Sequence, residues 1–133
     1  MGAMNTFTKE ERLRSRLLIG RIFADGASFF LYPFAIHYLE LPLDSLPFPS
    51  QMTISVAKKR FKRAVDRNLL KRRLREIYRL NKANFYSELN NGNKQVVFLV
   101  SYSAKEIMTT EQLAQKLVPA LNRLVKELNF EKA

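Results

Sequence analysis

The sequence of 133 residues contains no cysteine and only one histidine, His37. The lack of cysteine excludes disulfides, thiolate metal ligands and a cysteine nucleophile. Acidic residues are also scarce, because 12 Asp and Glu stand against 23 Lys and Arg, giving a net charge of +11. A chain with this balance is expected to bind a polyanion, which is a nucleic acid, an anionic membrane surface or an acidic protein.

Long apolar runs are missing as well. No stretch approaches the roughly 18 apolar residues that span a bilayer, and the first 17 residues are charged and lack the apolar centre of a signal peptide. We therefore expect a cytoplasmic protein without membrane association. The length suits a single domain over residues 1–133. Met1-Gly2-Ala3 precede a second methionine, and we interpret these three residues as a cloning remnant.

The first half of the chain predicts one helix and two strands. Apolar spacing indicates a helix over residues 7–23, where Thr8 and Glu11 resemble a capping box. Aromatic and branched residues predict a strand over 29–41, bent at Pro33. A proline-rich loop at 42–50 leads to a second short strand at 52–57.

The second half predicts two helices around one strand. A helix without glycine or proline starts at residue 61 or 62 and continues past residue 80 to the turn at 90–93. Residues 95–102 are nearly all apolar, which is typical of a central strand buried on both faces. A C-terminal helix begins at Thr109 or Thr110, and Pro119 is expected to kink it or to mark a late start. Its apolar stripe consists of Leu113, Leu117, Leu121, Leu124 and Leu128. The order predicts an α+β domain with one small sheet.

Positive charge is concentrated in residues 58–79, which carry +9 of the net +11. On a helical wheel the polar residues of this segment share an arc of roughly 100°, and they are Asn68, Lys71, Arg72, Arg75 and Arg79. Three apolar residues, Leu70, Leu74 and Ile77, lie within roughly 60° on the opposite side. Arg67 and Tyr78 fall at the edge of the basic face. The apolar side is therefore expected to pack on the sheet while the basic side faces a partner.

Adjacent like charges on a helix repel one another by a few tenths of a kcal/mol per pair, so stability does not explain this face. Binding of a phosphate backbone does explain this face, because the cations neutralise phosphates and counterions are released. Arginine suits bidentate phosphate contacts, and Asn68 can reach a base edge or a 2′-hydroxyl. Two alternatives remain, which are a solvated face that only keeps the protein soluble and a helix lying on a membrane surface.

No catalytic site is expected in the protein itself. The acidic residues are scattered, and Asp66 and Glu76 lie about 15 Å apart along the helix, too far to share a metal and better placed to orient arginines. His37 lacks a second histidine for RNA cleavage and is interpreted as a packed residue. A set of aromatic residues is assigned mainly to the core, with one or two members on a binding face: Phe29, Phe30, Tyr32, Phe34 and Tyr38.

Three segments resemble the signature of the protein subunit of bacterial ribonuclease P: Ser55-Val56-Ala57-Lys58-Lys59, Ala64-Val65-Asp66-Arg67-Asn68 and Lys71-Arg72-Arg73-Leu74-Arg75-Glu76. The sequence Ile22-Phe23-Ala24-Asp25-Gly26 is similar to the end of that family's first helix, and residues 96–100 to its late strand. The chain departs from the pattern in three ways. Leu69 replaces an arginine, a glycine after the Lys-Lys pair is missing, and the cluster Lys58-Lys59-Arg60 is one residue longer than usual.

The resemblance implies an α/β sandwich with a small mixed sheet of about four strands and a left-handed βαβ crossover through the basic helix. It implies a ribonucleoprotein that removes the 5′ leader of precursor tRNA, with catalysis and magnesium on the RNA subunit and no obligate protein partner. Contacts to the catalytic RNA are then expected from Lys58, Lys59, Arg60, Arg63, Arg67, Asn68, Lys71, Arg72, Arg75 and Arg79. A cleft for the leader is expected at Phe23, His37, Arg67 and Asn68.

Two other function classes stay open on the residues alone. One is a non-catalytic RNA- or DNA-binding module of the ribosome-associated type, which composition permits equally. The other is a stand-alone nuclease, which the scattered acidic residues disfavour. Processing of precursor tRNA with and without the catalytic RNA separates the three.

Overall fold

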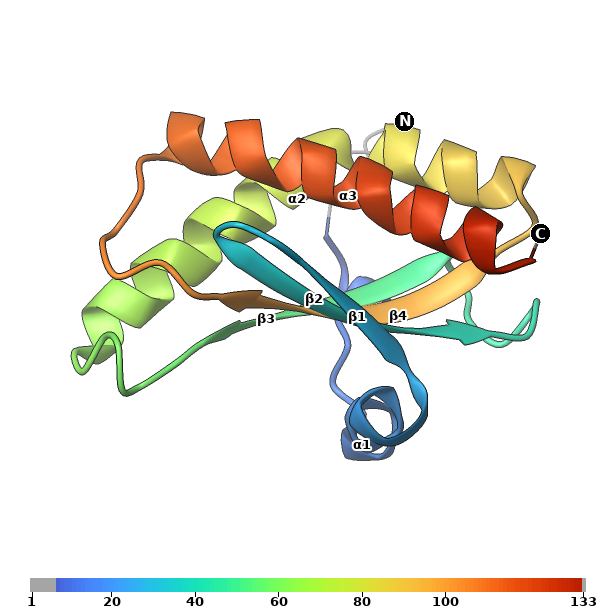
Figure 1. The fold of residues 1–133 in the computed structure, drawn as a ribbon, viewed down its shortest axis with the longest axis horizontal. Helices are drawn as coiled ribbons and strands as arrows, with labels where there is room; N and C mark the ends of the chain where they lie inside the picture. The colour runs from blue at the N-terminus through green and yellow to red at the C-terminus, as the bar shows by residue number, and fades with distance from the viewer. Residues whose placement is uncertain (1–6, 133) are drawn as a thin grey trace.

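The structure is a computed structural model and describes residues 7–132. The interpretation of residues 1–3 as a cloning remnant therefore lies outside the described residues. In chain order the elements are η2 (Lys9–Glu11, a 3-10 turn), α1 (Arg16–Asp25), β1 (Ala27–Leu31), β2 (Phe34–Leu41), β3 (Ser50–Val56), α2 (Ala64–Asn91), β4 (Gln95–Tyr102) and α3 (Thr110–Lys132). Figure 1 shows them in two main layers, with α2 and α3 on one side of the sheet and α1 on the other.

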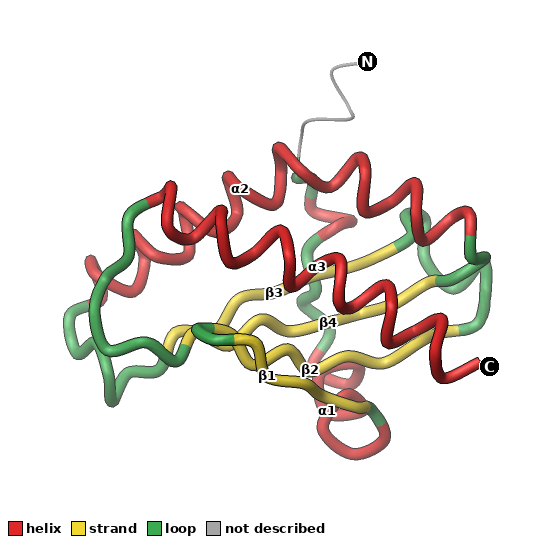
Figure 2. Tube along the Cα trace, turned by 45° about the horizontal axis from the view of Figure 1, so that its top comes forward, coloured by secondary structure: helices red, strands yellow, loops and turns green. Residues whose placement is uncertain are grey.

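The four strands form one mixed sheet in the order β1-β2-β4-β3. β1 pairs with β2 and β2 with β4 in antiparallel fashion, whereas β3 and β4 are parallel neighbours. The connection between β3 and β4 is α2, so the predicted crossover through the basic helix and the predicted α+β class are confirmed (Figure 2). The left-handed sense of the crossover stays a prediction.

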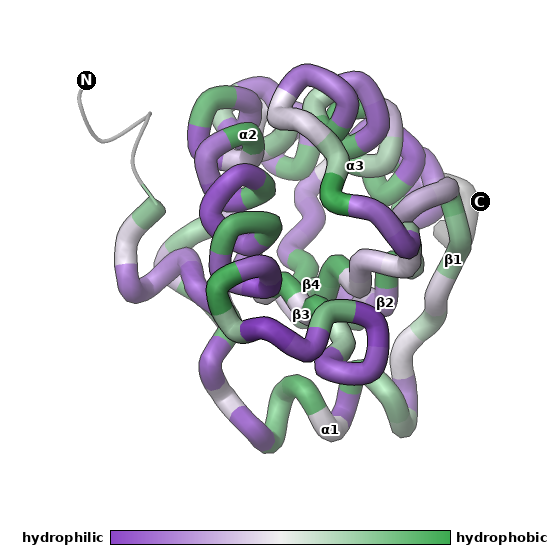
Figure 3. The backbone as a smooth tube through the Cα atoms, turned by 90° about the vertical axis from the view of Figure 1, so that its left-hand side faces the viewer, coloured by the Kyte–Doolittle hydropathy of each residue, from purple (hydrophilic) through white to green (hydrophobic). Residues whose placement is uncertain are grey.

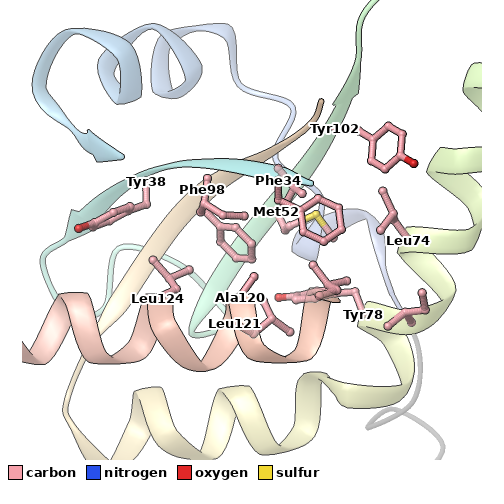
Figure 4. Close-up of a cluster of buried hydrophobic side chains, with 14 of the residues drawn as sticks. Phe34, Tyr38, Met52, Leu74, Tyr78, Phe98, Tyr102, Ala120, Leu121 and Leu124 are labelled. Carbon is pink, nitrogen blue, oxygen red and sulfur yellow. The ribbon is translucent and has the colours of Figure 1, made fainter. Parts of the chain in front are cut away.

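The main core lies between the sheet and the helices α2 and α3. Because side chains alternate along a strand, Phe34, Ile36 and Tyr38 of β2 point to the same face, and all three are buried there. Figure 4 shows this cluster, to which α2 contributes Leu74 and Tyr78. β4 supplies Val96, Phe98, Val100 and Tyr102, and α3 supplies Leu113, Leu117, Leu121, Leu124 and Leu128. The apolar stripe predicted for the C-terminal helix is therefore its core face.

A smaller core forms on the other face of the sheet, under α1. It consists of Leu13, Ile22, Leu39, Leu41 and Val97, with Leu18 and Ile19 packed against it. These strand residues lie at the end of β2 and the start of β4. Beyond them the same face carries half-buried side chains such as His37 and Thr53 and one buried side chain, Leu99, and α1 leaves part of the sheet open.

The helix predicted over residues 7–23 is wrong in its first half. The chain forms the turn η2, then runs extended through Arg12, and α1 begins only at Arg16. The reason is tertiary, because the backbone N–H of Leu13 donates to the carbonyl of Met52 at 3.0 Å and Arg12 bridges to Met52 at the edge of the sheet. The capping box of Thr8 and Glu11 does form, but it caps the short turn.

The strand predicted over residues 29–41 is also wrong, since it is a hairpin of two strands. β1 ends at Leu31, the chain turns at Tyr32-Pro33, whose peptide bond is cis, and β2 starts at Phe34. Of the aromatic set, Phe29, Phe34 and Tyr38 are buried, whereas Phe30 and Tyr32 are exposed. This division confirms the assignment of the set mainly to the core, whereas a binding role for its exposed members stays a prediction.

Two predictions about the helices need correction. Tyr78 was placed at the edge of the basic face, but it is fully buried and meets the rings of Phe7, Phe85 and Phe98 edge to face. Pro119 does not mark a late helix start, because α3 begins at Thr110 and continues through it. Thr109 is the cap, since its hydroxyl accepts from the N–H of Gln112 at 3.2 Å.

A buried ion pair fastens the N-terminal segment to α2. The carboxylate of Glu11 accepts hydrogen bonds from Lys82 and, at 2.7 Å, from the hydroxyl of Tyr86, and both charged side chains are almost fully buried. Burial opposes ionisation of Glu11, but the hydrogen bonds from Lys82, from the backbone of Thr8 and from Tyr86 outweigh it and lower the pKa of its carboxyl. Glu11 is therefore ionised at neutral pH and holds η2 on α2.

We expect Glu11→Gln and Lys82→Met each to lower the free energy of unfolding by about 3–5 kcal/mol, because each leaves the other charge buried without its partner. The double variant should lose clearly less than the sum of the two. Urea unfolding measures all three. Glu76→Gln, which breaks an exposed pair with Arg79, should change stability little. Additive losses in the double variant would show that the pair does not act as a unit.

Candidate nucleic-acid interface

The two sides of α2 divide as the helical wheel predicts. Leu70, Leu74 and Ile77 are buried in the main core. Asn68 and Arg72 are exposed on the outer side, and they line a shallow hollow of about 640 Å³ together with Arg63, Val65, Asp66, Leu69 and Arg75. Figure 3 views the end of the molecule where α2 begins and shows hydrophilic residues along the helix and the loop before it. The hollow joins cations and an amide to a small apolar patch.

Leu69 lies half-buried in this hollow beside Val65, whose side chain is largely exposed. The position at which the family pattern has an arginine is therefore an apolar part of the surface here. The cations on either side of it are kept. An apolar side chain thus replaces a charged one within an otherwise basic surface.

Arg67 has a structural role in addition to its charge. Its Nη1 donates to the carbonyl of Phe61 at 2.8 Å and to that of Lys62 at 3.0 Å. Phe61 is itself buried, with its ring 6.0 Å from that of Tyr102. Arg67 therefore fixes the loop between β3 and α2, on which Lys58, Lys59 and Arg60 are exposed.

Arg79 and Glu76 form an exposed ion pair, with Nε to Oε1 at 3.1 Å. The hydrogen bond from Arg79 lowers the pKa of Glu76, and the same bond raises the pKa of Arg79. This pair confirms the interpretation of Glu76 as a residue that orients a neighbouring arginine. Arg73 points elsewhere, since its Nη1 donates to the carbonyl of Met108 at 2.6 Å and holds the segment before α3.

Arg75 connects the basic face to cations that sequence reasoning missed. It lines the hollow described above and also a second one of about 180 Å³, which contains Arg12 and Arg14 of the N-terminal segment. Burial and the nearby charge of Arg12 lower the pKa of Arg75. No signal in the sequence places Arg12 there, because the helix predicted over 7–23 puts it on a different element.

The open face of the sheet carries Phe23 and His37, which the structure brings together. Their ring centroids lie 5.0 Å apart, and the side chain of Phe23 is 60% exposed. Gly26 allows this contact, because a Cβ there would collide with the carbonyl oxygens of Ile22 and Tyr38 and push α1 away from β2. The glycine that ends the first helix thus positions Phe23 over the sheet.

Thr53 links this aromatic pair to α2. It pairs with Leu99 of β4, which pairs with His37 of β2, so the three side chains form one row across the open face. Thr53 also lines the second hollow together with Arg75. Of the four residues predicted for the leader cleft, Phe23 and His37 therefore form one cluster, Arg67 and Asn68 lie at the start of α2, and Thr53 and Arg75 lie between them.

Within residues 7–132, no three side chains of His, Asp or Glu gather in a way that could hold a metal ion. In the same part of the chain, no helix is long and apolar enough to cross a membrane. The surface itself presents cations, hydroxyls and aromatic rings.

Comparison with known proteins shows the family of the chain. The family model described as Ribonuclease P matches residues 7–125. A ribonuclease P protein component of Porphyromonas gingivalis is 48% identical over 75 residues, and the match covers 56% of this chain and 54% of that protein. One of Chlorobaculum tepidum is 32% identical over 110 residues, covering 76% and 70%. The chain thus spans about half the length of the Porphyromonas relative.

Solved structures agree in fold. The RNase P protein from Thermotoga maritima is 29% identical, with a TM-score of 0.64 and coverage of 85% of this chain and 96% of that one. A Staphylococcus aureus RNase P protein mutant with defective mRNA degradation activity is 25% identical, with a TM-score of 0.70 and coverage of 87% and 89%. The family model covers most of the chain and the solved structures share its fold, and the chain belongs to the ribonuclease P protein family.

Proposed function

We propose that this chain is the protein component of ribonuclease P, which binds the catalytic RNA and the 5′ leader of precursor tRNA and assists removal of the leader. The observation that carries the proposal is the arrangement that links the basic face of α2, through Arg75 and Thr53, to Phe23 and His37 on the open sheet. A helix with cations alone would fit any polyanion. The adjoining aromatic pair favours single-stranded RNA.

The basic face of α2 suits the catalytic RNA. Arg72 and Asn68 are exposed and line one hollow of about 640 Å³. Arginine forms bidentate hydrogen bonds with phosphate, and each phosphate that is neutralised releases counterions. The loop with Lys58, Lys59 and Arg60, held by Arg67, extends the same positive surface toward β3.

The open sheet suits the leader. Exposed bases of a single strand stack on aromatic rings, while hydroxyl groups contact sugars and phosphates. Phe23 offers an exposed ring over His37, and Thr53 offers a hydroxyl in the same row. The leader would then lie between a surface that reads bases by stacking and a helix that holds the catalytic RNA.

Catalysis is assigned to the RNA subunit in this proposal. The carboxylates of the described residues are dispersed, which does not match the paired carboxylates of metal-dependent nucleases. Residues 7–132 therefore do not fit a magnesium site of their own, and we place the magnesium ions on the RNA and the substrate. The protein binds and positions the leader.

The direct test is cleavage of precursor tRNA by a bacterial ribonuclease P RNA at low magnesium, with and without the protein. The protein should restore leader removal, because its cations replace part of the charge screening that magnesium otherwise supplies. Absence of stimulation would favour a general RNA- or DNA-binding module. Leader cleavage by the protein without the RNA would overturn the assignment of catalysis.

The salt dependence of RNA binding should depend on the cations of α2. We expect Lys71→Ala and Arg72→Ala to weaken binding of the catalytic RNA and to reduce the log–log salt slope by about 0.7–0.9 or less for each lost phosphate contact. Arg67→Ala should do the same and also loosen the loop before α2. Filter binding over a salt series measures both quantities. Lys116→Ala on α3, which is exposed, is the control, and slopes unchanged in all three variants would remove α2 from the interface.

The exposed ring of Phe23 should contribute to binding of the leader. Phe23→Ala should weaken binding of precursor tRNA more than binding of mature tRNA, because only the precursor has bases to stack on the ring. Stacking contributes about 1–3 kcal/mol per base. The ring is 60% exposed, so the substitution leaves the core intact. Leu17→Ala on the same helix, at a side chain that is 84% exposed, is the matched control. An equal loss for both tRNA forms would exclude a leader contact.

A further inference from the structure

Two exposed aromatic rings on the β1–β2 hairpin take no part in the site described above. Phe30 is 56% and Tyr32 49% exposed, and their ring centroids lie 6.5 Å apart at 60°. Their neighbours Phe29 and Leu31 pack toward the main core. The hairpin therefore has its core residues already, and Phe30 and Tyr32 form an additional aromatic pair on the surface.

Strand register places Phe30 on the same open face as His37. Phe30 pairs with Ala35, and Ser28 pairs with His37, so Phe30 and His37 are diagonal neighbours. Diagonal neighbours in an antiparallel pair lie about 7–8 Å apart, within reach of aromatic side chains. The Phe23–His37 pair and the Phe30–Tyr32 pair are thus two successive parts of one surface.

Small side chains continue this surface across the sheet. Ala35 pairs with Ser101 of β4, and Ser101 pairs with Ser55 of β3. Beyond Phe30, this row therefore holds only a methyl group and two hydroxyls, with no further bulky side chain. A nucleotide can approach the sheet closely there, and the hydroxyls can donate to a phosphate or accept from a 2′-hydroxyl.

Hydrogen bonds hold the hairpin in place. The backbone N–H and the hydroxyl of Ser103 donate to the carbonyl of Pro33, at 2.8 and 2.9 Å. The turn is thereby fastened to the end of β4, and the two rings are presented on a fixed support. Preorganisation of this kind lowers the entropy cost of binding.

Positive charge lies at the same end of the sheet. Register pairs Phe34 with Tyr102 and Tyr102 with Val56, so the hairpin turn, the end of β4 and the end of β3 coincide (Figure 2). β3 leads directly into the exposed Lys58, Lys59 and Arg60. Aromatic rings beside a basic groove are the combination by which proteins bind single-stranded nucleic acid without sequence preference.

We propose that Phe30 and Tyr32 form a second stacking platform, which receives leader bases beyond those held at Phe23 and His37. The inference rests on the proposed function and extends it, since it makes affinity depend on leader length. The occupant is single-stranded RNA, because the platform lies beside the Phe23–His37 pair on the same face and at the end of the sheet where the basic loop begins.

The test measures binding of precursor tRNAs whose leaders are lengthened one nucleotide at a time, with the protein assembled on ribonuclease P RNA. Affinity of the unmodified protein should rise with leader length and then level off. The variant Phe30→Ser/Tyr32→Ser should level off at a shorter leader, with long leaders bound about tenfold more weakly, as expected for the loss of one stacked base. Tyr32→Phe should retain the rise in affinity with leader length, because it keeps the ring. The control is Leu43→Ser, which changes an exposed apolar residue in the loop after β2.

Fluorescence can show directly whether leader bases stack at position 30. The chain contains no tryptophan, so Phe30→Trp introduces a single reporter, whose fluorescence should be quenched by long leaders and much less by short ones. Leu43→Trp should not distinguish them.

The results of these experiments distinguish failure of the stacking platform from failure of the proposed function. A full gain with leader length in the double variant, or equal quenching by long and short leaders, would overturn the platform and leave the proposed function standing. No gain in the unmodified protein would overturn both. Altered self-association of the double variant, with unchanged leader affinity, would make the hairpin a protein interface and would also overturn the platform.

Discussion

Strands β3 and β4 run parallel as neighbours, and parallel neighbours require a connection that crosses from one end of the sheet to the other. That connection is α2, whose 28 residues extend over about 42 Å. The crossover fixes which side of the helix meets the core. Burial of Leu70, Leu74 and Ile77 contributes about 1.5–3 kcal/mol each, whereas each like-charge pair on the outer side costs a few tenths. Packing therefore outweighs the repulsion, and the helix can hold its cations toward a partner.

The N-terminal segment depends on the same helix. Glu11 reaches Lys82 and Tyr86 on α2, and Arg12 follows directly along the edge of β3. The buried pair therefore also determines where Arg12 meets Arg75. From that edge the chain enters α1, which packs on the far face of the sheet and presents Phe23. The basic and the aromatic parts of the surface are positioned by one continuous set of contacts.

The elements with strong periodicity could be predicted from the sequence, and those that depend on distant contacts could not. The apolar run at 95–102 and the stripes of α2 and α3 correspond to the observed β4 and to the buried helix faces. The hairpin was missed because its turn, Tyr32-Pro33, lacks the Asn-Gly type of signal. The break after η2 was missed because it comes from pairing with Met52, which lies 40 residues away. For the site, the wheel predicts the exposed cations of α2, but only the register of the sheet shows that Thr53 joins them to His37.

The central claim is that the leader lies on the open sheet beside the start of α2. Because the chain has no cysteine, a single Ser55→Cys on the open face and a single Ser87→Cys near the end of α2 can each carry an iron chelate that produces hydroxyl radicals. Both positions are exposed. In the complex of protein, ribonuclease P RNA and precursor tRNA, the account predicts strand cuts in the leader from position 55 and few from position 87. Equal cutting from both positions, or cutting from position 87 alone, would contradict it.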